Sequence, residues 1–394
     1  MTRVVDNVVA ETNQKIDVLA ITHEHWDHLS GFIQAADSFK KLAAGEVWVA
    51  WTEDPNDSLA SQLKQQLGKA KKALAACGAA LRMGGQDDTA DMLDDLALSP
   101  LGAAGADTST SAAFDKAKGM AGSKPLRLCK PSNDPIEIDG GNARIYVLGP
   151  PHDSALIHKI NPSASNPETY ALALDGGGVL PLGVAAALGL TDGGDDGAPF
   201  HRRVSIPLDL KGRPSFFEEL YDGKDDDWRR IDGDWLGAAA DFALALQSYT
   251  NNTSLVLALE LGDRGEGEVL LFAGDAQVGN WESWQACKWA LGSSVVTGPD
   301  LLGRAIFYKV GHHGSHNATL KGHGLEEMVS LKAAIIPVDE AEAKKKRWGS
   351  MPLPELIQAL SEKLKDGPLL RTDQTPSGRW DNVVVADDYF ELSL

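Results

Sequence analysis

The chain has 394 residues, of which 43% are hydrophobic and 24% are charged. This balance is typical of a globular protein, and the length suits one large α/β domain with insertions or two smaller domains. The formal net charge of −19 disfavours non-specific binding to long nucleic acid, because an acidic surface repels phosphates. It does not exclude a phosphoester substrate held locally by bound metal ions.

The cysteines and the apolar segments indicate in which compartment of the cell the protein is expected. Cys77, Cys129 and Cys287 are odd in number and far apart, so neither a disulfide framework nor a cysteine zinc site is expected. The N-terminal segment lacks the apolar core of a signal peptide, and the longest apolar stretch, at 179–190, is broken by proline and glycine. We therefore predict a soluble, cytoplasmic protein with no membrane contact, and the oligomeric state is left open.

Strands are predicted where short apolar runs rich in β-branched residues occur, and helices where apolar residues recur at intervals of three to four. The predicted strands are 16–22, 46–51, 136–138, 143–148, 254–261, 268–272, 305–310 and 333–338. The predicted helices are 29–44, much of 57–97 and 353–365, with a loose Ala/Gly/Ser-rich connector at 101–123. Strands that alternate with helices along the whole chain indicate an α/β fold.

Two segments of unusual composition are expected to be insertions in a single domain over residues 1–394. Residues 53–135 are predicted to form a helical insertion. Residues 185–237 are rich in glycine and aspartate and dense in turn residues, so we expect a lid or another insertion between core strands.

A histidine-rich segment follows the first predicted strand. The sequence THEHWDH at 22–28 contains three of the ten histidines. In an extended loop His23 and His25 point the same way and can meet one metal ion, and Asp27 and His28 can meet a second one nearby. Imidazole and carboxylate are ligands that zinc prefers, with manganese or iron as alternatives. A chance cluster of surface histidines is the competing interpretation, but the position directly after a strand favours a metal site.

The extended segment THEHWDHLSGF resembles the signature motif of the metallo-β-lactamase superfamily. The second half of the chain is also similar to the metallo-β-lactamase domain of ComEC-like DNA-uptake proteins. The matching segments are NNTSLVL at 251–257, LLFAGDA at 270–276, KVGHHGS at 309–315 and LRTD at 370–373. The resemblance implies an αβ/βα metallo-β-lactamase sandwich, with a dinuclear metal site along one edge of its sheets.

The resemblance also implies roles for individual residues. His23 and His25 would hold the first of two zinc ions, Asp27 and His28 the second, and Asp275 would bridge them.

In this family the remaining ligand of the first metal is a histidine that follows an intermediate strand. His152, just after the predicted strand 143–148, is our candidate. His158 and His201 are weaker candidates.

The chain departs from the family pattern in two places. The stretch 348–352 lacks the glycine-histidine-proline common in ComEC-like chains, so the missing ligand is expected from His312 or His313, with His313 slightly favoured. His316 and His323 are expected to be outside the ligand set. In addition, few residues precede the histidine motif, so we expect the first sheet either to lack its N-terminal edge strands or to receive them from elsewhere.

These ligands predict a hydrolase in which two metals lower the pKa of a shared water. Asp27 would be both a ligand and an acceptor of the water's proton, and His316 or Tyr170 could assist the leaving group. A phosphodiester of a nucleotide or short nucleic acid is the expected substrate. The alternatives are a carboxylic ester, lactone or thioester, or a non-catalytic binding module that keeps the same fold.

Overall fold

The computed structural model of the chain shows a mixed α/β protein, which confirms the predicted class. The described residues are 1–83, 87, 90–91, 109–131, 133–138, 140, 142–163, 168–169, 248–345, 349–376 and 378–394. The chain divides into two compact units. The first unit comprises Met1–Leu63, Pro100–Gly177 and Ser248–Leu394, and the second comprises Lys64–Ser99 and Gly178–Gln247.

The two predicted insertions relate differently to these units. The segment 53–135 is divided between them. It contains the long helix α5 (Ser58–Met83), but also strand β3 (Arg127–Cys129), which belongs to a sheet of the first unit. The predicted lid at 185–237 lies outside the described residues.

A small parallel sheet with the order β1-β2-β3 is built from the first part of the chain. Its other two strands are β1 (Lys15–Ala20) and β2 (Ala43–Ala50). The residues ahead of β1 form helix α1 (Thr2–Glu11). The remaining helices of this part are α2 (Trp26–Leu29), α3 (Gly31–Gln34), α4 (Ala36–Phe39) and α7 (Thr110–Gly119).

A seven-stranded sheet has the order β12-β11-β10-β7-β6-β5-β4. Strands β7, β10, β11 and β12 run parallel, whereas β4 to β7 pair antiparallel. Its strands are β4 (Ile136–Ile138), β5 (Ala143–Gly149), β6 (Val256–Leu261), β7 (Glu268–Phe272), β10 (Ala305–Lys309), β11 (Ala333–Ile336) and β12 (Leu369–Arg371).

The other elements of the second half are helices and two hairpins. The helices are α8 (Ser154–His158), α12 (Val278–Trp284), α13 (Gly298–Gly303), α14 (Glu340–Lys345) and α15 (Pro354–Leu364). The hairpins are β8 (Lys288–Leu291) with β9 (Ser294–Thr297), and β13 (Val383–Val385) with β14 (Phe390–Leu392).

The two sheets of the first unit pack face to face, and strand β2 shows why. Its side chains alternate between faces, as the two-residue period of a strand requires. Trp48 and Ala50 point into a core shared with β5 and β6 of the large sheet. Val47 and Val49 point the other way, into a core shared with helix α7. A strand buried on both faces explains the continuous apolar run that predicted it.

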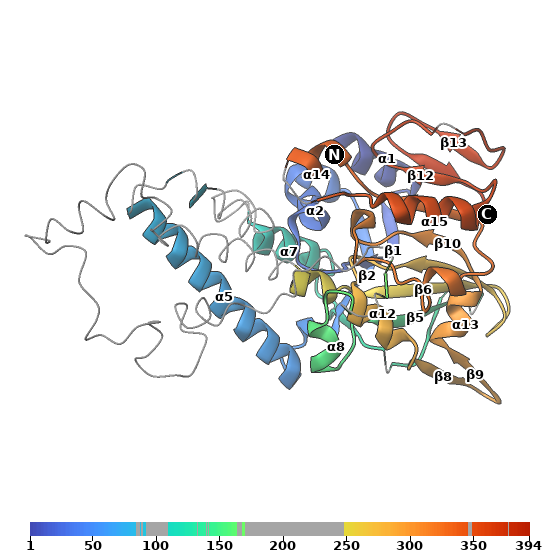
Figure 1. Cartoon of the computed structure of the whole chain (residues 1–394), viewed down its shortest axis with the longest axis horizontal. Helices are drawn as coiled ribbons and strands as arrows, with labels where there is room; N and C mark the ends of the chain where they lie inside the picture. Colours follow the sequence, from blue (N-terminus) through green and yellow to red (C-terminus); the bar gives the residue numbers. More distant parts are fainter. Residues whose placement is uncertain are drawn as a thin grey trace, which may run out of the picture. The chain divides into compact units, whose positions relative to one another are not determined.

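Helices cover the outer faces of both sheets, as Figure 1 shows for α12, α13 and α15. On the small sheet, α7 packs through Phe114 and the alanines beside it. On the large sheet, the indoles of Trp281 and Trp284 from α12 lie in the principal core, together with Leu356 and Leu360 of α15. The first unit is therefore layered as helices, sheet, sheet and helices.

Two predicted elements differ from the structure. The helix predicted at 29–44 is three short helices that end at Phe39, with breaks where Ser30 and Ala35 separate them. The connector predicted at 101–123 contains α7, whose N-cap residue Ser109 accepts a hydrogen bond from the amide of Ala112 at 3.1 Å. A serine at the N-cap position followed by an alanine-rich run is the sequence pattern that indicates this helix.

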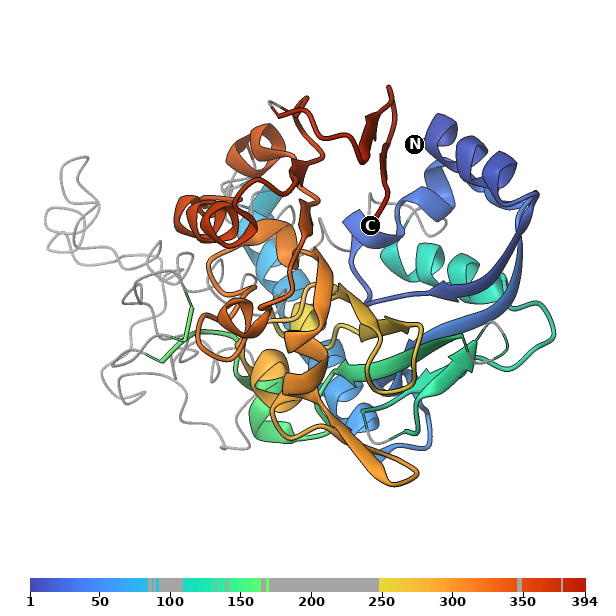
Figure 2. The same cartoon turned by 90° about the vertical axis from the view of Figure 1, so that its right-hand side faces the viewer.

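The C-terminal hairpin lies beside the N-terminal helix, as Figure 2 shows. The guanidinium of Arg3 on α1 lies 2.7 Å from a carboxylate oxygen of Asp388, between β13 and β14. The ends of the chain thus meet at the same part of the first unit.

Candidate metal centre

The histidine- and aspartate-bearing loops of both sheets meet at one edge. The segment His23 to His28 follows strand β1 of the small sheet. Asp275 follows β7, and His312 and His313 follow β10, which is the parallel neighbour of β7 in the large sheet. Because parallel strands end at the same edge of a sheet, their loops converge there.

One group of possible ligands consists of His23, His25 and Asp275, all buried. One ligand atom from each lies within 4.8 Å of the others. Nε2 of His23 is 3.0 Å from Nδ1 of His25 and 3.8 Å from Oδ2 of Asp275. This is the set predicted for the first metal together with the predicted bridging residue.

A second group consists of Asp27, Asp275 and His313, again with ligand atoms within 4.8 Å of one another. Nε2 of His313 lies 3.0 Å from Oδ2 of Asp27. Nε2 of His28 lies 3.2 Å from Oδ2 of Asp275 and 3.4 Å from Oδ2 of Asp27. Asp275 therefore belongs to both groups.

The donor atoms fit divalent cations. Imidazole nitrogens and carboxylate oxygens are the ligands of zinc, manganese and iron. Moreover, Nε2 of His28 is buried without a hydrogen-bond partner among the described residues, although two carboxylates lie close to it. A buried polar atom without a partner is costly, and a cation between these groups would give it one.

Polar groups outside the ligand set orient the histidine rings. Nδ1 of His23 lies 3.2 Å from the hydroxyl of Thr22 and 3.0 Å from that of Ser254, which also accepts a hydrogen bond from the amide of Asp275. Nδ1 of His313 donates to the carbonyl of Pro337 at 2.7 Å. Such contacts hold Nε2 toward a metal. Sequence reasoning assigned no role to Ser254, although it is a buried serine in the matched segment 251–257.

Burial is the largest influence on the pKa values of His23, His25 and His312. Burial lowers the pKa of His23, with the neighbouring His28 adding to the effect, and burial lowers the pKa of His25 to about 4. Burial likewise lowers the pKa of His312 to about 4. These three rings are therefore neutral at neutral pH and keep a lone pair for a ligand.

Opposite charges dominate around the second group. Burial acts to raise the pKa of Asp27 and Asp275, but the charge of His28 together with the other neighbouring histidines outweighs it and holds both pKa values below the ordinary range. Burial acts to lower the pKa of His28 and His313. Asp275 raises the pKa of His28, and the hydrogen bond to Asp27 raises that of His313 to about 9. His313 is therefore protonated at neutral pH, and its imidazolium lies beside the carboxylate of Asp27.

His313 belongs to the second group of possible ligands, whereas His312 belongs to neither group. The Nε2 of His312 lies 2.9 Å from Nδ2 of Asn251, and its Nδ1 lies 2.7 Å from the hydroxyl of Ser315. The two histidines have φ of 40° and 55° and form a tight turn with Gly314. Their ring centroids lie 5.9 Å apart. The amide of His312 donates to Oδ1 of Asp275 at 3.2 Å, which places this turn against the shared carboxylate.

His152, which was predicted as a ligand of the first metal, also belongs to neither group. Its Nε2 lies 2.8 Å from Oδ2 of Asp57, and its ring packs edge-on against Trp51 at 4.4 Å. Asp57 also accepts from the amides at the start of α5, so His152 is tied to the beginning of that helix. The strand end that predicted His152 as a ligand belongs to β5, which ends at the same edge as β7 but is separated from it by β6.

The remaining histidines lie elsewhere or outside the description. His158 bonds to the carbonyl of Ser154, and His323 pairs with Glu327. His316 is partly buried, which lowers its pKa. His201 and Tyr170 fall outside the described residues.

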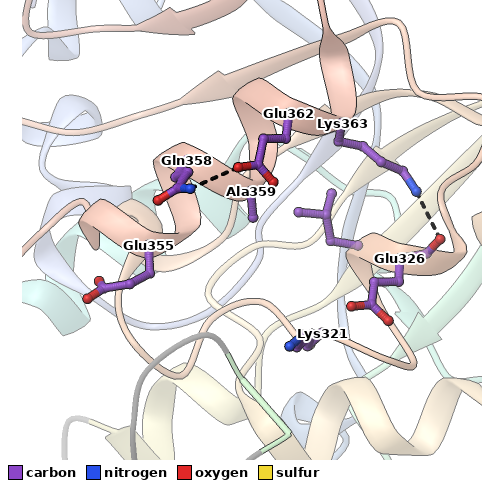
Figure 3. A pocket seen from close by; sticks show the side chains of 8 residues that line it. Lys321, Glu326, Glu355, Gln358, Ala359, Glu362 and Lys363 are labelled. Carbon is purple, nitrogen blue, oxygen red and sulfur yellow. Dashed lines mark hydrogen bonds between the residues drawn. The ribbon is translucent and has the colours of Figure 1, made fainter.

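A surface pocket of about 470 Å³ lies apart from these ligands, between α15 and the turn around Glu326. Figure 3 shows its lining of opposite charges, with Lys363 donating to the carbonyl of Glu326 at 2.9 Å. Gln358 likewise donates to Glu362 at 2.8 Å. The lining contains lysine and glutamate side chains but no histidine, so this pocket is separate from the candidate metal ligands.

Comparisons with protein-family models, with curated proteins and with solved structures gave no match. Among the helices that the structure describes, none has the length and apolar character needed to cross a membrane.

Proposed function

We propose that the chain is a metal-dependent hydrolase of the metallo-β-lactamase superfamily. The observation that carries this proposal is the place of Asp275 in both groups of possible ligands. A carboxylate with two oxygens, shared by two sets of histidines, suits a pair of cations a few Å apart. The layering of helices, sheet, sheet and helices, with the ligands at one sheet edge, is what the αβ/βα sandwich of this superfamily requires.

Two divalent cations, zinc in our proposal with manganese or iron as alternatives, would lower the pKa of a bound water and polarise the bond to be cleaved. His23, His25, Asp275 and the residues of the second group would hold them. The buried, neutral rings of His23 and His25 keep their lone pairs. Asp27 is partly exposed, so its carboxylate can contact both a cation and the attacking water and accept its proton.

A phosphodiester of a nucleotide or a short nucleic acid is the substrate that we favour. The support is the likeness of segments 251–257, 270–276 and 309–315 to ComEC-like domains. The same set of ligands would also serve a carboxylic ester, a lactone or a thioester. The net charge of −19 favours small substrates over long nucleic acid.

The first prediction tests this proposal through the shared carboxylate. Asp275→Ala should lose at least one of two bound metals and reduce hydrolysis of bis-p-nitrophenyl phosphate by ~10³-fold or more, since a bridging ligand serves both ions. Metal content by mass spectrometry and initial rates measure this. Asp37→Ala is the control, because Asp37 is an exposed carboxylate on α4, paired only with Lys40.

Full metal content and wild-type rates in Asp275→Ala would contradict the proposal. A wild-type protein that binds metal but cleaves neither phosphodiesters nor a panel of esters, lactones and thioesters would favour the non-catalytic binding module.

A further inference from the structure

The inner face of the large sheet, which is the face toward the small sheet, is covered only in part. Leu257 of β6 lies on this face and packs against the core that contains Trp48. Residues paired across neighbouring strands share one face, so the inner face continues through Phe272 of β7 to Lys309 of β10. Phe272 is 38% exposed, whereas Leu271, on the opposite face, is 1% exposed. The inner face is therefore covered at β6 and exposed at β7.

Two aromatic rings and one cation lie on the exposed part of this face. Phe307 is two residues before Lys309 on β10, so both side chains are on the same side of the sheet. The ring centroid of Phe307 lies 5.9 Å from that of Phe272, with the ring planes tilted by 52°. In the part of the chain that the structure describes, the ammonium of Lys309 forms neither a hydrogen bond nor an ion pair. Phe272, Phe307 and Lys309 are called the inner-face patch below.

The inner-face patch adjoins the candidate metal centre along two neighbouring strands. Phe272 precedes Asp275 by three residues, and Lys309 precedes His312 by three residues. Three residues of chain span no more than about 11 Å, so each Cα atom of the pair lies within that distance of the loop residue that follows it. The amide of His312 donates to the carbonyl of Gly274 at 3.3 Å, which keeps the two strand ends side by side.

Lys309 also acts across the space between the two sheets, on the loop that follows β1. Burial acts most strongly to lower the pKa of His28 in this loop, and the charge of Lys309 acts in the same direction, although Asp275 and Asp27 raise this pKa overall. A charge shifts the pKa of another group in this way only at short range. The ammonium of Lys309 therefore lies on the side of the large sheet that faces the metal centre.

We propose that the inner-face patch binds the nucleoside part of a nucleotide phosphodiester whose phosphate lies at the metal centre. The base stacks on the exposed ring of Phe272 with Phe307 beside it, and Lys309 contacts an oxygen of the phosphate. The inference rests on the proposed function and names its substrate more closely. Charge complementarity supports this occupant, because a phosphodiester is an anion and Lys309 is an unpaired cation. An apolar peptide segment on the same face would bury that cation without a partner, which is costly.

The test compares two esters with the same leaving group, p-nitrophenyl thymidine 5′-phosphate and methyl p-nitrophenyl phosphate. The full-length protein loaded with Zn²⁺ should prefer the thymidine ester in kcat/KM by ~10-fold or more, which is the magnitude of stacking one base on an aromatic ring. Phe272→Ala should lower kcat/KM, mainly through KM, by ~10-fold more for the thymidine ester than for the methyl ester. Phe272→Trp should keep the preference. Val295→Ala is the matched control, because Val295 is an exposed apolar residue on the β8–β9 hairpin.

The lysine is tested on the same two esters. Lys309→Gln should lower kcat/KM for both by a similar factor of ~10, because both carry the phosphate that the ammonium contacts, and Lys309→Arg should recover part of this loss. Lys288→Gln is the control, since Lys288 is exposed on the β8–β9 hairpin. Calorimetry gives a measurement independent of turnover. Thymidine 5′-monophosphate should bind the wild-type protein ~10-fold more tightly than methyl phosphate does, and Phe272→Ala should remove this difference.

The unfolding temperature and the metal content of each variant are measured alongside, and Phe272→Leu replaces Phe272→Ala if the latter does not fold. Equal losses on both esters in Phe272→Ala would mean that the ring only supports the fold, and would overturn the inference. A wild-type protein that cleaves both esters equally well would also overturn it, while leaving the proposed function intact. A dimer that Phe272→Ala converts to a monomer would show that a second copy covers this face, again overturning the inference. A protein that cleaves neither ester and binds neither phosphate would overturn both.

Discussion

Among single residues, the two left-handed histidines bear most directly on the metal centre. A residue other than glycine pays about 1–2 kcal/mol to adopt a left-handed conformation. His312 and His313 both adopt it, and the turn places Nε2 of His313 3.0 Å from Oδ2 of Asp27. Strained backbone conformations of this kind persist at functional sites, where they hold a side chain in the position that the site requires.

This strain gives a prediction on stability in the absence of metal. His313→Gly should be more stable than His313→Ala by about 1 kcal/mol, because only glycine adopts φ of 55° without cost. His28, inside helix α2, is the control: there the alanine variant should be the more stable one. Urea unfolding in the presence of a chelator measures both differences. If alanine were as stable as glycine at His313, the turn would not be left-handed.

Individual residues also show which parts of the metal centre could be predicted from the sequence alone. The order of His23, His25, Asp27 and His28 after a strand was readable, because their spacing is local. The approach of His313 to Asp27 was not, because it depends on a left-handed turn after β10 that meets the loop after β1 only in the folded chain.

At the scale of elements, the carboxylate of Glu168 helps to hold the segment that follows α8 against α12. Glu168 accepts from the amide and the hydroxyl of Ser163, both at 2.6 Å, and from Lys159 at 3.0 Å. Lys159 also pairs with Glu282 of α12. Glu168 and Lys159 therefore connect the residues after α8 to this helix.

The contribution of Glu168 to the stability of the fold depends on pH, because its pKa is shifted. Burial acts to raise its pKa, but the hydrogen bonds from Ser163 and Lys159 lower it from 4.5 to about 2. A pKa lower in the folded than in the unfolded state stabilises the protein above the unfolded value, and this contribution is lost as the pH falls from 4.5 toward 2.

Glu168→Gln should therefore lower the free energy of unfolding by about 1–3 kcal/mol at pH 7 and by much less at pH 3. Urea unfolding at several pH values measures this, with Glu11→Gln on the exposed face of α1 as the control. An identical difference at pH 7 and pH 3 would exclude the ionised carboxylate as the cause.

Strands and helices were predictable from the sequence where their hydrophobic patterns were strong. The buried strands β4 to β7, β10 and β11 were recovered within two residues, because continuous apolar runs leave few alternatives. Helix α7 was missed since its alanine-rich sequence resembles a linker until it is packed against Val47 and Val49.

At the scale of the whole first unit, the metal centre depends on how the two sheets pack. Each sheet contributes only some of the ligands, so their spacing is set by the core between the sheets. Trp48 is 1% exposed and is the largest side chain in that core.

Trp48→Ala should destabilise the protein by about 3–5 kcal/mol and also weaken metal binding, although Trp48 touches no ligand. Trp289→Ala is the matched control. Trp289 is equally well buried, but it packs on the outer face of the large sheet against Tyr146. The free energy of unfolding and the affinity for metal are measured for both variants. Equal losses of metal affinity would show that general destabilisation, and not the spacing of the sheets, is responsible.

The division of the ligands between two sheets also has a consequence for the order of events during synthesis. Asp27 and His313 are separated by 286 positions in the chain. At the usual speed of translation the second of them emerges roughly 15 to 60 s after the first. For that interval the nascent chain carries its histidine-rich loop without the carboxylate and imidazoles that complete it. A cation captured early would be held by a few exposed side chains and would exchange freely, so tight loading belongs to the last stage of folding, after the ribosome has delivered the second sheet.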